Sequence, residues 1–201
     1  MKMIVLNGAP RSGKDTFLNL INLLFGDNTE TKVLTPFSYK DVLYSGVARR
    51  YGLTAEEVKI LNADTITKDD PSPKFKGKSV RQALIYESEN VIKKTFGASG
   101  VAMSTFNSLD MDFMLSCDTV KDSDRILITA DGGFQEELDL AMEHYEMTRK
   151  DIFLVRMLRD GCTFDKDSRS YLENPDLVVD NNGSKADLCK YIPYIQEFIE
   201  S

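Results

Sequence analysis

Residues 8–16 of the chain read Gly-Ala-Pro-Arg-Ser-Gly-Lys-Asp-Thr, directly after the apolar run Met-Ile-Val-Leu at residues 3–6. A helical pattern follows, with Phe17, Ile21 and Leu24 on one stripe. A strand, a glycine-rich turn and a helix in this order aim a row of backbone N–H groups at an anion. The stretch therefore predicts a phosphate-binding loop between a buried strand and a helix.

The loop residues have separate expected roles. Glycines let the backbone approach phosphate oxygens closely, and the lysine reaches the β- and γ-oxygens as a point charge. A carboxylate stands where this motif usually has Ser or Thr, and it is expected to hold Mg²⁺ directly or through water. An ordinary glycine turn with a surface lysine is the alternative interpretation. The residues predicted to contact the phosphates of ATP are Gly8, Ala9, Ser12, Gly13, Lys14, Asp15 and Thr16.

Outward from the loop, strand and helix patterns alternate. Strand-length apolar runs occur at residues 3–6, 32–36, 125–130, 151–158 and 177–180, and helical stripes lie between them, the last at residues 188–199. Alternation of this kind predicts an α/β fold with a parallel five-stranded sheet and helices on both faces. We expect a P-loop kinase architecture with a helical acceptor-binding insertion and a lid.

The length, charge and composition of the chain argue against several classes of function. The chain has 201 residues and 22.7 kDa, which predicts one domain over residues 1–201. Its net charge of −7 argues against a nucleic-acid polymer as partner. No apolar run approaches the ~20 residues that span a bilayer, and glycine and proline come too early for a signal peptide, so we expect neither membrane attachment nor secretion.

The cysteines and the histidine exclude other chemistries. Cys117, Cys162 and Cys189 are odd in number and lack CxxC spacing, which argues against a zinc site or a disulfide framework. They favour a reducing cytoplasm, that of the host if the chain is phage-encoded. The lone His144 leaves no multi-histidine metal site. The sequence leaves self-association into a homodimer open.

Capping signatures mark three helix starts, in which a hydroxyl residue is followed three positions later by an acid or amide. The pairs are Thr54 with Glu57, Ser79 with Gln82, and Ser184 with Asp187. Two polar stretches interrupt the pattern. Residues 63–78 are predicted to form a loop between helices, and residues 159–174 a lid.

Charged residues at predicted strand ends complete the candidate site. Asp131 follows the strand at residues 125–130, where a P-loop fold presents an acid to Mg²⁺; a turn or capping role is the alternative. Arg156 and Arg159 flank the end of the next strand, and Arg169 lies in the lid. Arginines so placed would stabilise charge on a transferring phosphoryl group, although a solvated surface role fits each one equally.

Together these segments resemble the phage-type deoxynucleoside monophosphate kinases, relatives of adenylate kinase. The phosphate loop, including Asp15, is similar to that of the family. The resemblance continues over the four further segments that follow: TPFSYKDVLYSGVARRYG (residues 35–52), SVRQALIYESENVIKKTFG (79–97), ITADGGFQEELDLA (128–141) and DLVVDNNGSKADL (176–188).

The resemblance implies ATP-dependent phosphorylation of a deoxynucleoside 5′-monophosphate to the diphosphate, with Mg²⁺ as cofactor. It implies an acceptor-binding insertion over about residues 38–97. The acceptor residues would be Ser38, Tyr39, Lys40, Arg81, Gln82 and Tyr86, the catalytic residues Lys14, Arg11, Arg156 and Arg159, and the metal ligands Asp15 and Asp131. Ordinary helix packing or capping is the alternative for Tyr39, Gln82 and Tyr86.

Two departures separate the chain from this pattern. Gly133 stands where the family has arginine, and the lid sequence DKDSRSY (residues 165–171) lacks the family's His-x-Ser-Glu-like pattern. Two other hypotheses remain. One is a kinase for another small phosphorylated acceptor such as phosphomevalonate, and the other is a nucleotide-binding regulatory module without transfer activity.

Overall fold

The computed structural model describes residues 1–26, 32–64, 66–115, 120–165 and 169–201. The chain divides into two compact units. Unit 1 comprises Met1–Ser38 and Cys117–Ser201, and unit 2 comprises Tyr39–Ser116. The predicted insertion at about residues 38–97 falls almost wholly in unit 2, and the predicted lid falls in unit 1.

Unit 1 is built on a parallel sheet of five strands in the order β2-β3-β1-β4-β5. The strands are β1 (Lys2–Gly8), β2 (Val33–Pro36), β3 (Arg125–Thr129), β4 (Ile152–Leu158) and β5 (Leu177–Asp180). β1 is central, with Val5 opposite Thr129 of β3 and Gly8 opposite Met157 of β4. The predicted α/β fold with a five-stranded parallel sheet is therefore confirmed.

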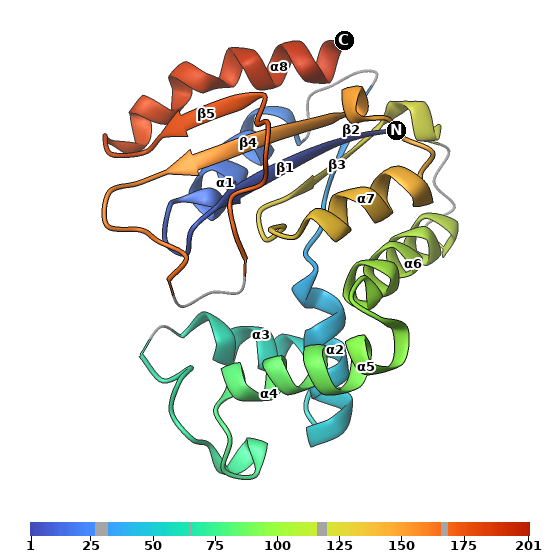
Figure 1. Ribbon diagram of the computed structural model, residues 1–201, viewed down its shortest axis with the longest axis vertical. Helices are drawn as coiled ribbons and strands as arrows, with labels where there is room; N and C mark the ends of the chain where they lie inside the picture. The colour runs from blue at the N-terminus through green and yellow to red at the C-terminus, as the bar shows by residue number, and fades with distance from the viewer. Residues whose placement is uncertain (27–31, 65, 116–119, 166–168) are drawn as a thin grey trace. The chain divides into compact units, whose positions relative to one another are not determined.

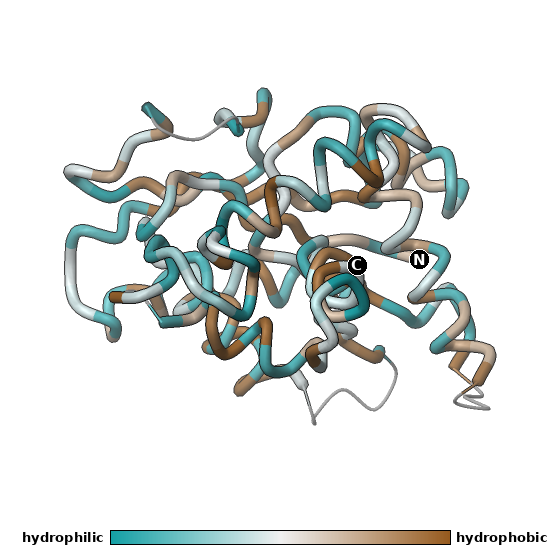
Figure 2. Tube along the Cα trace, turned by 90° about the horizontal axis from the view of Figure 1, so that it is seen from below, coloured by the Kyte–Doolittle hydropathy of each residue, from teal (hydrophilic) through white to brown (hydrophobic). Residues whose placement is uncertain are grey.

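Helices cover both faces of the sheet (Figure 1). Alternating residues of β1, among them Ile4 and Leu6, pack with Phe17 of α1 (Lys14–Phe25) and Ile195 of α8 (Ile192–Glu200). Helix α7 (Gln135–His144) covers the other face. Burial on both faces explains why the strands read as continuous apolar runs. The hydropathy colouring in Figure 2 shows these apolar stretches along the trace, separated by hydrophilic turns.

Within its described residues, unit 2 consists of helices joined by turns and loops, with no strand. Its elements are α2 (Lys40–Tyr51), α3 (Ala55–Ala63), the 3₁₀ turn η1 (Pro73–Phe75), α4 (Val80–Tyr86), the π-helical turn η2 (Glu87–Ile92), α5 (Lys93–Phe96) and α6 (Gly100–Leu115). A separate apolar core includes Val47, Val58, Phe75 and Val80. Unit 2 therefore has its own apolar core, which includes Phe75 from the loop at residues 66–78.

Short sequence motifs predict several helix starts correctly. Capping boxes form at Thr54 with Glu57 and at Ser79 with Gln82, as predicted. The predicted helix at residues 188–199 is divided, because Pro193 lies in the first turn of α8 and residues Lys185–Tyr191 form the 3₁₀ helix η5.

Short 3₁₀ helices η3 (Asp122–Asp124) and η4 (Arg149–Asp151) precede β3 and β4. Cys162 and Cys189 are free thiols, and Cys117 lies outside the described residues. Within the described ranges, no helix is long and apolar enough to cross a membrane.

Phe17→Ala is expected to lower the free energy of unfolding by about 3–5 kcal/mol, because the ring is fully buried between α1 and the sheet. Leu23→Ala on the same helix is the control, since that side chain is 78% exposed and should change stability by less than ~0.5 kcal/mol. Urea denaturation of both variants measures the difference. Equal losses would contradict the packing of α1 described above.

Candidate functional site: the phosphate loop and its surroundings

Two glycines determine the path of the phosphate loop. Gly13, the residue before α1, has φ = +97°, a left-handed conformation that strains any residue with a Cβ. A Cβ at Gly8 would lie 2.7 Å from Ser12 Oγ and 2.8 Å from the Met157 carbonyl oxygen. Gly8 is therefore required because a side chain at this position would not fit. Gly13 is required for space and also for its left-handed backbone.

Lys14 begins α1, and its ammonium group turns back over the loop. Nζ donates to the carbonyl oxygens of Gly8 at 2.7 Å and Ala9 at 2.8 Å, and the residue is only 8% exposed. A buried ammonium held against backbone carbonyls is an oriented positive charge at the start of a helix. The Ser12 hydroxyl, fully buried in the same loop, has no hydrogen-bond partner among the residues described.

Asn181, at the end of β5, braces the loop. Its side-chain Nδ2 donates to the Ser12 carbonyl oxygen at 2.8 Å, and its backbone N–H donates to the Leu158 carbonyl oxygen. A Cβ at Gly13 would lie 2.0 Å from Asn181 Nδ2. The family resemblance includes Asn181 in the segment at residues 176–188, but the sequence did not predict this contact, which joins residues 169 positions apart.

Asp131 lies after β3, the neighbour of β1 in the sheet. Its carboxylate accepts hydrogen bonds from Ser38 Oγ at 2.6 Å and from Thr129 Oγ1 at 2.8 Å. Ser38 was predicted to contact the acceptor; the structure places its hydroxyl on this acid. The two hydroxyl donors orient the carboxylate at the carboxyl edge of the sheet, where Mg²⁺ was predicted.

Glu137, in the first turn of α7, lies near Asp131. One carboxylate oxygen accepts the backbone N–H groups of Gly133 at 2.8 Å and Phe134 at 3.1 Å. Burial raises the pKa of the Glu137 carboxyl from 4.5 to about 7; the charge of Asp131 also raises it, while the two backbone donors and Arg169 lower it. The first turn of α7 therefore contains an acid whose pKa is raised to about 7.

Arg169 fills the space above Gly133. A Cβ at Gly133 would meet the Cδ, Cβ and Cγ atoms of Arg169 at 2.7–2.9 Å. The guanidinium Nη1 lies 3.4 Å from the Asp131 carbonyl oxygen. Gly133 does not have a positive φ, so this glycine serves to give room to the arginine stem.

Asn7 ties the same segment to β1. This buried amide donates to the Ser170 carbonyl oxygen at 3.1 Å and to the Gly132 carbonyl oxygen at 3.5 Å, and it accepts the Leu172 N–H at 3.0 Å. The residue next to Asn7 in the chain is Gly8 of the phosphate loop. The C-terminal part of the predicted lid is therefore fastened to the strand that carries the loop.

The three predicted catalytic arginines differ in their surroundings. Arg156 donates from Nη2 to the Leu172 carbonyl oxygen and lies 5.3 Å over the Tyr171 ring, so it packs against the base of the predicted lid. Its buried Nε has no acceptor within the described part of the chain. Arg11, with φ = +67°, and Arg159 are both exposed, the first on the phosphate loop and the second just after β4.

Asp15 and Thr16 occupy the first turn of α1, where Asp15 is exposed and Thr16 is half-buried. The described residues contain no group of three or more His, Cys, Asp or Glu side chains arranged to hold a metal ion. A metal here would thus depend on few protein ligands, which is the usual situation for Mg²⁺ bound together with phosphate oxygens.

The other predicted acceptor residues belong to unit 2. Tyr39 is 4% exposed and packs edge-on against Phe106 at 6.0 Å, so its ring is part of the core of that unit. Lys40 is half-buried as the first residue of α2. The packing interpretation therefore accounts for the Tyr39 ring.

The remaining predicted acceptor residues, Arg81, Gln82 and Tyr86, lie on α4. Gln82 Oε1 accepts the Ser79 N–H in the capping box. Arg81 Nε pairs with Asp69 Oδ1 at 2.8 Å, and both side chains are more than half exposed. The Tyr86 ring lies under Lys78 Nζ at 4.1 Å and Arg50 Cζ at 5.4 Å.

Comparisons with known proteins add the following. No family model and no curated protein matches this chain. Two similar solved structures are a mutant of the APS kinase from Mycobacterium tuberculosis and the shikimate kinase from Aquifex aeolicus. The first is 14% identical with a TM-score of 0.47, covering 100% of this chain and 97% of that one. The second is 14% identical with a TM-score of 0.36, covering 97% and 96%. At these scores the fold class rests on the strand order and the loop described above.

Gly13→Ala is expected to weaken ATP binding at least tenfold and to destabilise the protein, because the new Cβ combines a left-handed backbone with the Asn181 contact. Gly52→Ala is the matched control. It has φ = +70° with nothing within 4 Å of the new Cβ, so it carries only the backbone strain, ~1–2 kcal/mol. Calorimetric titration with ATP and urea denaturation separate the two effects. If both variants bind ATP equally, the contact with Asn181 is unimportant.

Glu137→Gln should alter the pH dependence of stability. The folded pKa of Glu137 lies above its unfolded value, so the native state binds more protons between these values and wild-type stability falls as pH rises from about 4.5 to 7. Glutamine does not titrate, so the variant lacks this pH-dependent loss of stability. As the pH rises, the free energy of unfolding of the variant should therefore increase relative to that of wild type, by at most about 1.4 kcal/mol per pH unit. Urea denaturation at pH 5, 6, 7 and 8 measures it, and a difference independent of pH would refute the raised pKa.

Proposed function

We propose that the chain is an ATP-dependent kinase that phosphorylates a deoxynucleoside 5′-monophosphate. The observation that carries the proposal is the phosphate loop: a glycine-bounded turn at the start of α1, with the Lys14 ammonium folded over it and a buried, unpartnered Ser12 hydroxyl among the residues described. A donor-lined loop at a helix N-terminus suits the β- and γ-phosphates of ATP. The deoxynucleotide acceptor is supported by the sequence resemblance set out above.

Catalysis by such an enzyme is mainly positioning and charge stabilisation. Lys14 would neutralise charge on the transferring group and the exposed Arg11 and Arg159 would contribute from the loop and from the end of β4. Arg156 would act from the base of the lid, with its buried Nε as a donor. Arg169 would supply a cation beside Gly133, where the resembled family has an arginine in the sequence.

The residues present fit a bound Mg²⁺ ion. Asp131 and Asp15 offer carboxylate oxygens and Thr16 a hydroxyl oxygen, all hard ligands suited to this cation. When bound with ATP, Mg²⁺ would supply positive charge and so lower the negative charge that the protein must offset. Ser38 and Thr129 would keep the Asp131 carboxylate oriented for that role through their hydroxyl donors.

Arg81 would bind the acceptor phosphate. Its guanidinium already pairs with an exposed carboxylate, and a phosphate offers the same two-oxygen geometry with more charge. Gln82 and Tyr86 of α4 and Lys40 of α2 would contribute further contacts to the acceptor. Tyr39 would support this region only by packing in the core of unit 2.

Lys14→Ala is expected to lower phosphoryl transfer by about 10²–10³-fold or more while leaving the fold intact. Transfer from labelled ATP to a panel of deoxynucleoside monophosphates measures the rate, and circular dichroism checks the fold. The exposed Lys185→Ala is the control and should retain wild-type rates. Activity of Lys14→Ala near wild type would remove the loop as the ATP site.

The same panel separates the alternatives. Transfer only to another phosphorylated acceptor, such as phosphomevalonate, would replace the deoxynucleotide proposal with a different kinase. ATP binding without transfer to any acceptor would support a regulatory module instead.

A further inference from the structure

Glu87 is a buried carboxylate in unit 2, at the start of the π-helical turn η2. Its side chain is 7% exposed, and Oε2 accepts a hydrogen bond from Arg50 Nε at 2.9 Å. Arg50 lies in the last turn of α2. A carboxylate is costly to remove from water, and pairing with a cation seldom repays that cost in full. Stability alone therefore does not account for this ion pair.

Two further features around Glu87 also lower stability. Gly46 lies in the interior of α2, where glycine destabilises a helix relative to alanine. A Cβ at Gly46 would lie 2.5 Å from Glu87 Oε1 and 2.8 Å from its Cδ and Cγ atoms, so the glycine makes room for the carboxylate. The π-helical turn that begins at Glu87 is a rare form that occurs often at functional sites. All these features place one carboxylate against the Arg50 guanidinium.

The Arg50 guanidinium is fixed along one edge and open along another. Only Nε bonds to Glu87, and within the described part of the chain the two Nη atoms have no hydrogen-bond partner. The Arg50 side chain is 38% exposed, so this second edge is accessible to a ligand. Two parallel N–H donors in one plane have the geometry that binds two oxygens of a phosphate.

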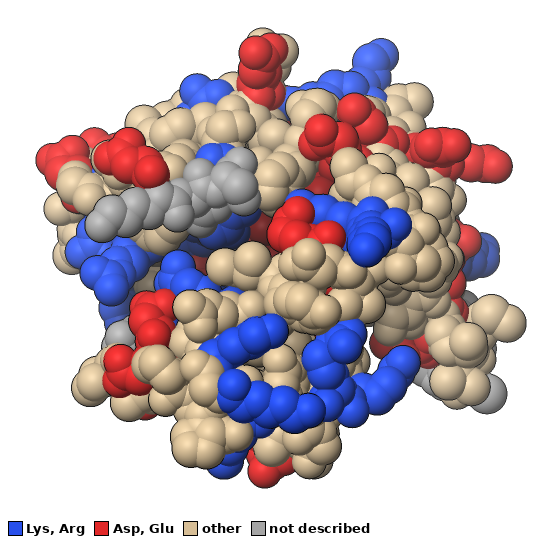
Figure 3. All heavy atoms as spheres, turned by 60° about the horizontal axis from the view of Figure 1, so that its bottom comes forward, with Lys and Arg blue, Asp and Glu red and all other residues tan. Residues whose placement is uncertain are grey.

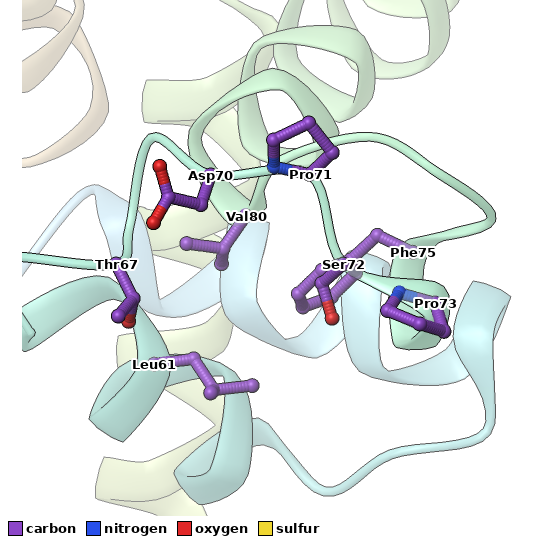
Figure 4. Close-up of a pocket in the computed structure, with 8 residues that line it drawn as sticks. All are labelled: Leu61, Thr67, Asp70, Pro71, Ser72, Pro73, Phe75 and Val80. Carbon is purple, nitrogen blue, oxygen red and sulfur yellow. The ribbon is translucent and has the colours of Figure 1, made fainter.

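The Tyr86 ring joins this arginine to a second cation. Arg50 Cζ lies 5.4 Å and Lys78 Nζ lies 4.1 Å from the centre of the ring, which is 37% exposed as a residue. Lys78 has no carboxylate partner among the residues that the structure describes. In the chain it stands between Phe75 and Val80, two buried residues that line the small pocket drawn in Figure 4. Two cations with ordered attachments therefore flank one ring.

We infer that Arg50 and Lys78 bind the diphosphate group of a small anion over the Tyr86 ring. Two cations at one ring repel each other, and an anion between them replaces this repulsion with attraction. A single phosphate can face Arg50 alone, whereas a diphosphate has oxygens at both ends and reaches Lys78 as well. The diphosphate group can come from free pyrophosphate or from a nucleoside diphosphate.

This site differs from the two phosphate positions proposed above. The phosphate loop belongs to unit 1 and shares no residue with it. Arg81 lies five positions before Tyr86 on α4, which places the two side chains ~140° apart around the helix axis. Arg81 also pairs with a different acid, Asp69. The diphosphate site therefore does not depend on the proposed kinase activity.

The test is a nuclear magnetic resonance titration of the ¹⁵N-labelled full chain with pyrophosphate, compared with sodium chloride at matched ionic strength. The reporters are the Arg50 Nε–H and the backbone N–H groups of Lys78 and Tyr86, while the Gly13 N–H reports the phosphate loop separately. Arg50→Gln should weaken binding at the Lys78 and Tyr86 reporters by about fivefold, the most that a partly exposed ion pair usually contributes. Inorganic phosphate should bind less tightly than pyrophosphate in wild type.

Three further variants locate the effect. Arg49→Gln removes the same charge from the neighbouring exposed residue and should leave the affinity within about twofold, because salt screens a charge that does not touch the ligand. Lys78→Gln should weaken the binding of pyrophosphate and leave that of phosphate unchanged. Gly46→Ala keeps every charge but displaces Glu87, so it should also weaken binding, by at least about twofold, if Glu87 positions Arg50.

A titration with ADP distinguishes the two sources. Equal affinities of pyrophosphate and ADP at the Arg50 Nε–H would assign the site to the diphosphate group in either form, and tighter binding of one would identify the source. Shifts at Arg50 no larger than those with sodium chloride, or an affinity unchanged by Arg50→Gln, would overturn the site. An equal loss in Arg49→Gln would show general attraction of anions and would overturn it too.

Two other results would contradict parts of the inference. Phosphate bound as tightly as pyrophosphate would overturn the diphosphate assignment, and an affinity unchanged by Gly46→Ala would overturn the positioning role of Glu87. Binding reported only by Gly13 would overturn the site in unit 2 and leave the proposed ATP site in place.

Discussion

The left-handed backbone at Gly13 is the constraint on which the phosphate site depends. The turn must reverse the chain between the end of β1 and the start of α1, and at φ = +97° only glycine does so without strain. The Asn181 amide then occupies the place where a side chain would project and donates to the Ser12 carbonyl oxygen. Because Asn181 follows β5, an edge strand holds the shape of a loop that begins on the central strand.

The charged side chains of Asp131, Glu137 and Arg169 are gathered near one another at some cost in stability. The charge of Asp131 contributes to raising the pKa of the half-buried Glu137 carboxyl, and Arg169 offsets part of this effect. The Arg169 stem lies against Gly133, where a Cβ would meet it at 2.7–2.9 Å. Half-buried charges gathered in this way are typical of functional sites rather than of cores optimised for stability. Figure 3 likewise shows basic side chains in local groups among acidic ones on a chain whose net charge is −7.

Signals contained in a few neighbouring residues were predictable. Apolar runs gave the five strands, hydroxyl–acid spacing gave the capping boxes at Thr54 and Ser79, and the glycine motif gave the position of the loop. Contacts between distant residues were not, since no local pattern encodes them. Asn7 with Leu172 and Asn181 with Ser12 each join residues more than 160 positions apart. Whether Tyr39 would face a ligand or pack on Phe106 likewise depended on the tertiary structure of unit 2.

The ion pair between Arg81 and Asp69 is weak, and this weakness matters for the binding of an anionic ligand. An ion pair whose partners are both more than half exposed contributes only ~0–1 kcal/mol to stability, because water screens both charges. Asp69 therefore contacts the guanidinium at little energetic gain. In the proposed function, a phosphate dianion, which carries more charge than the carboxylate and presents equivalent oxygens, would displace Asp69 from Arg81 and the released acid would return to solvent. A weak pair at this position does not compete strongly with an anionic ligand.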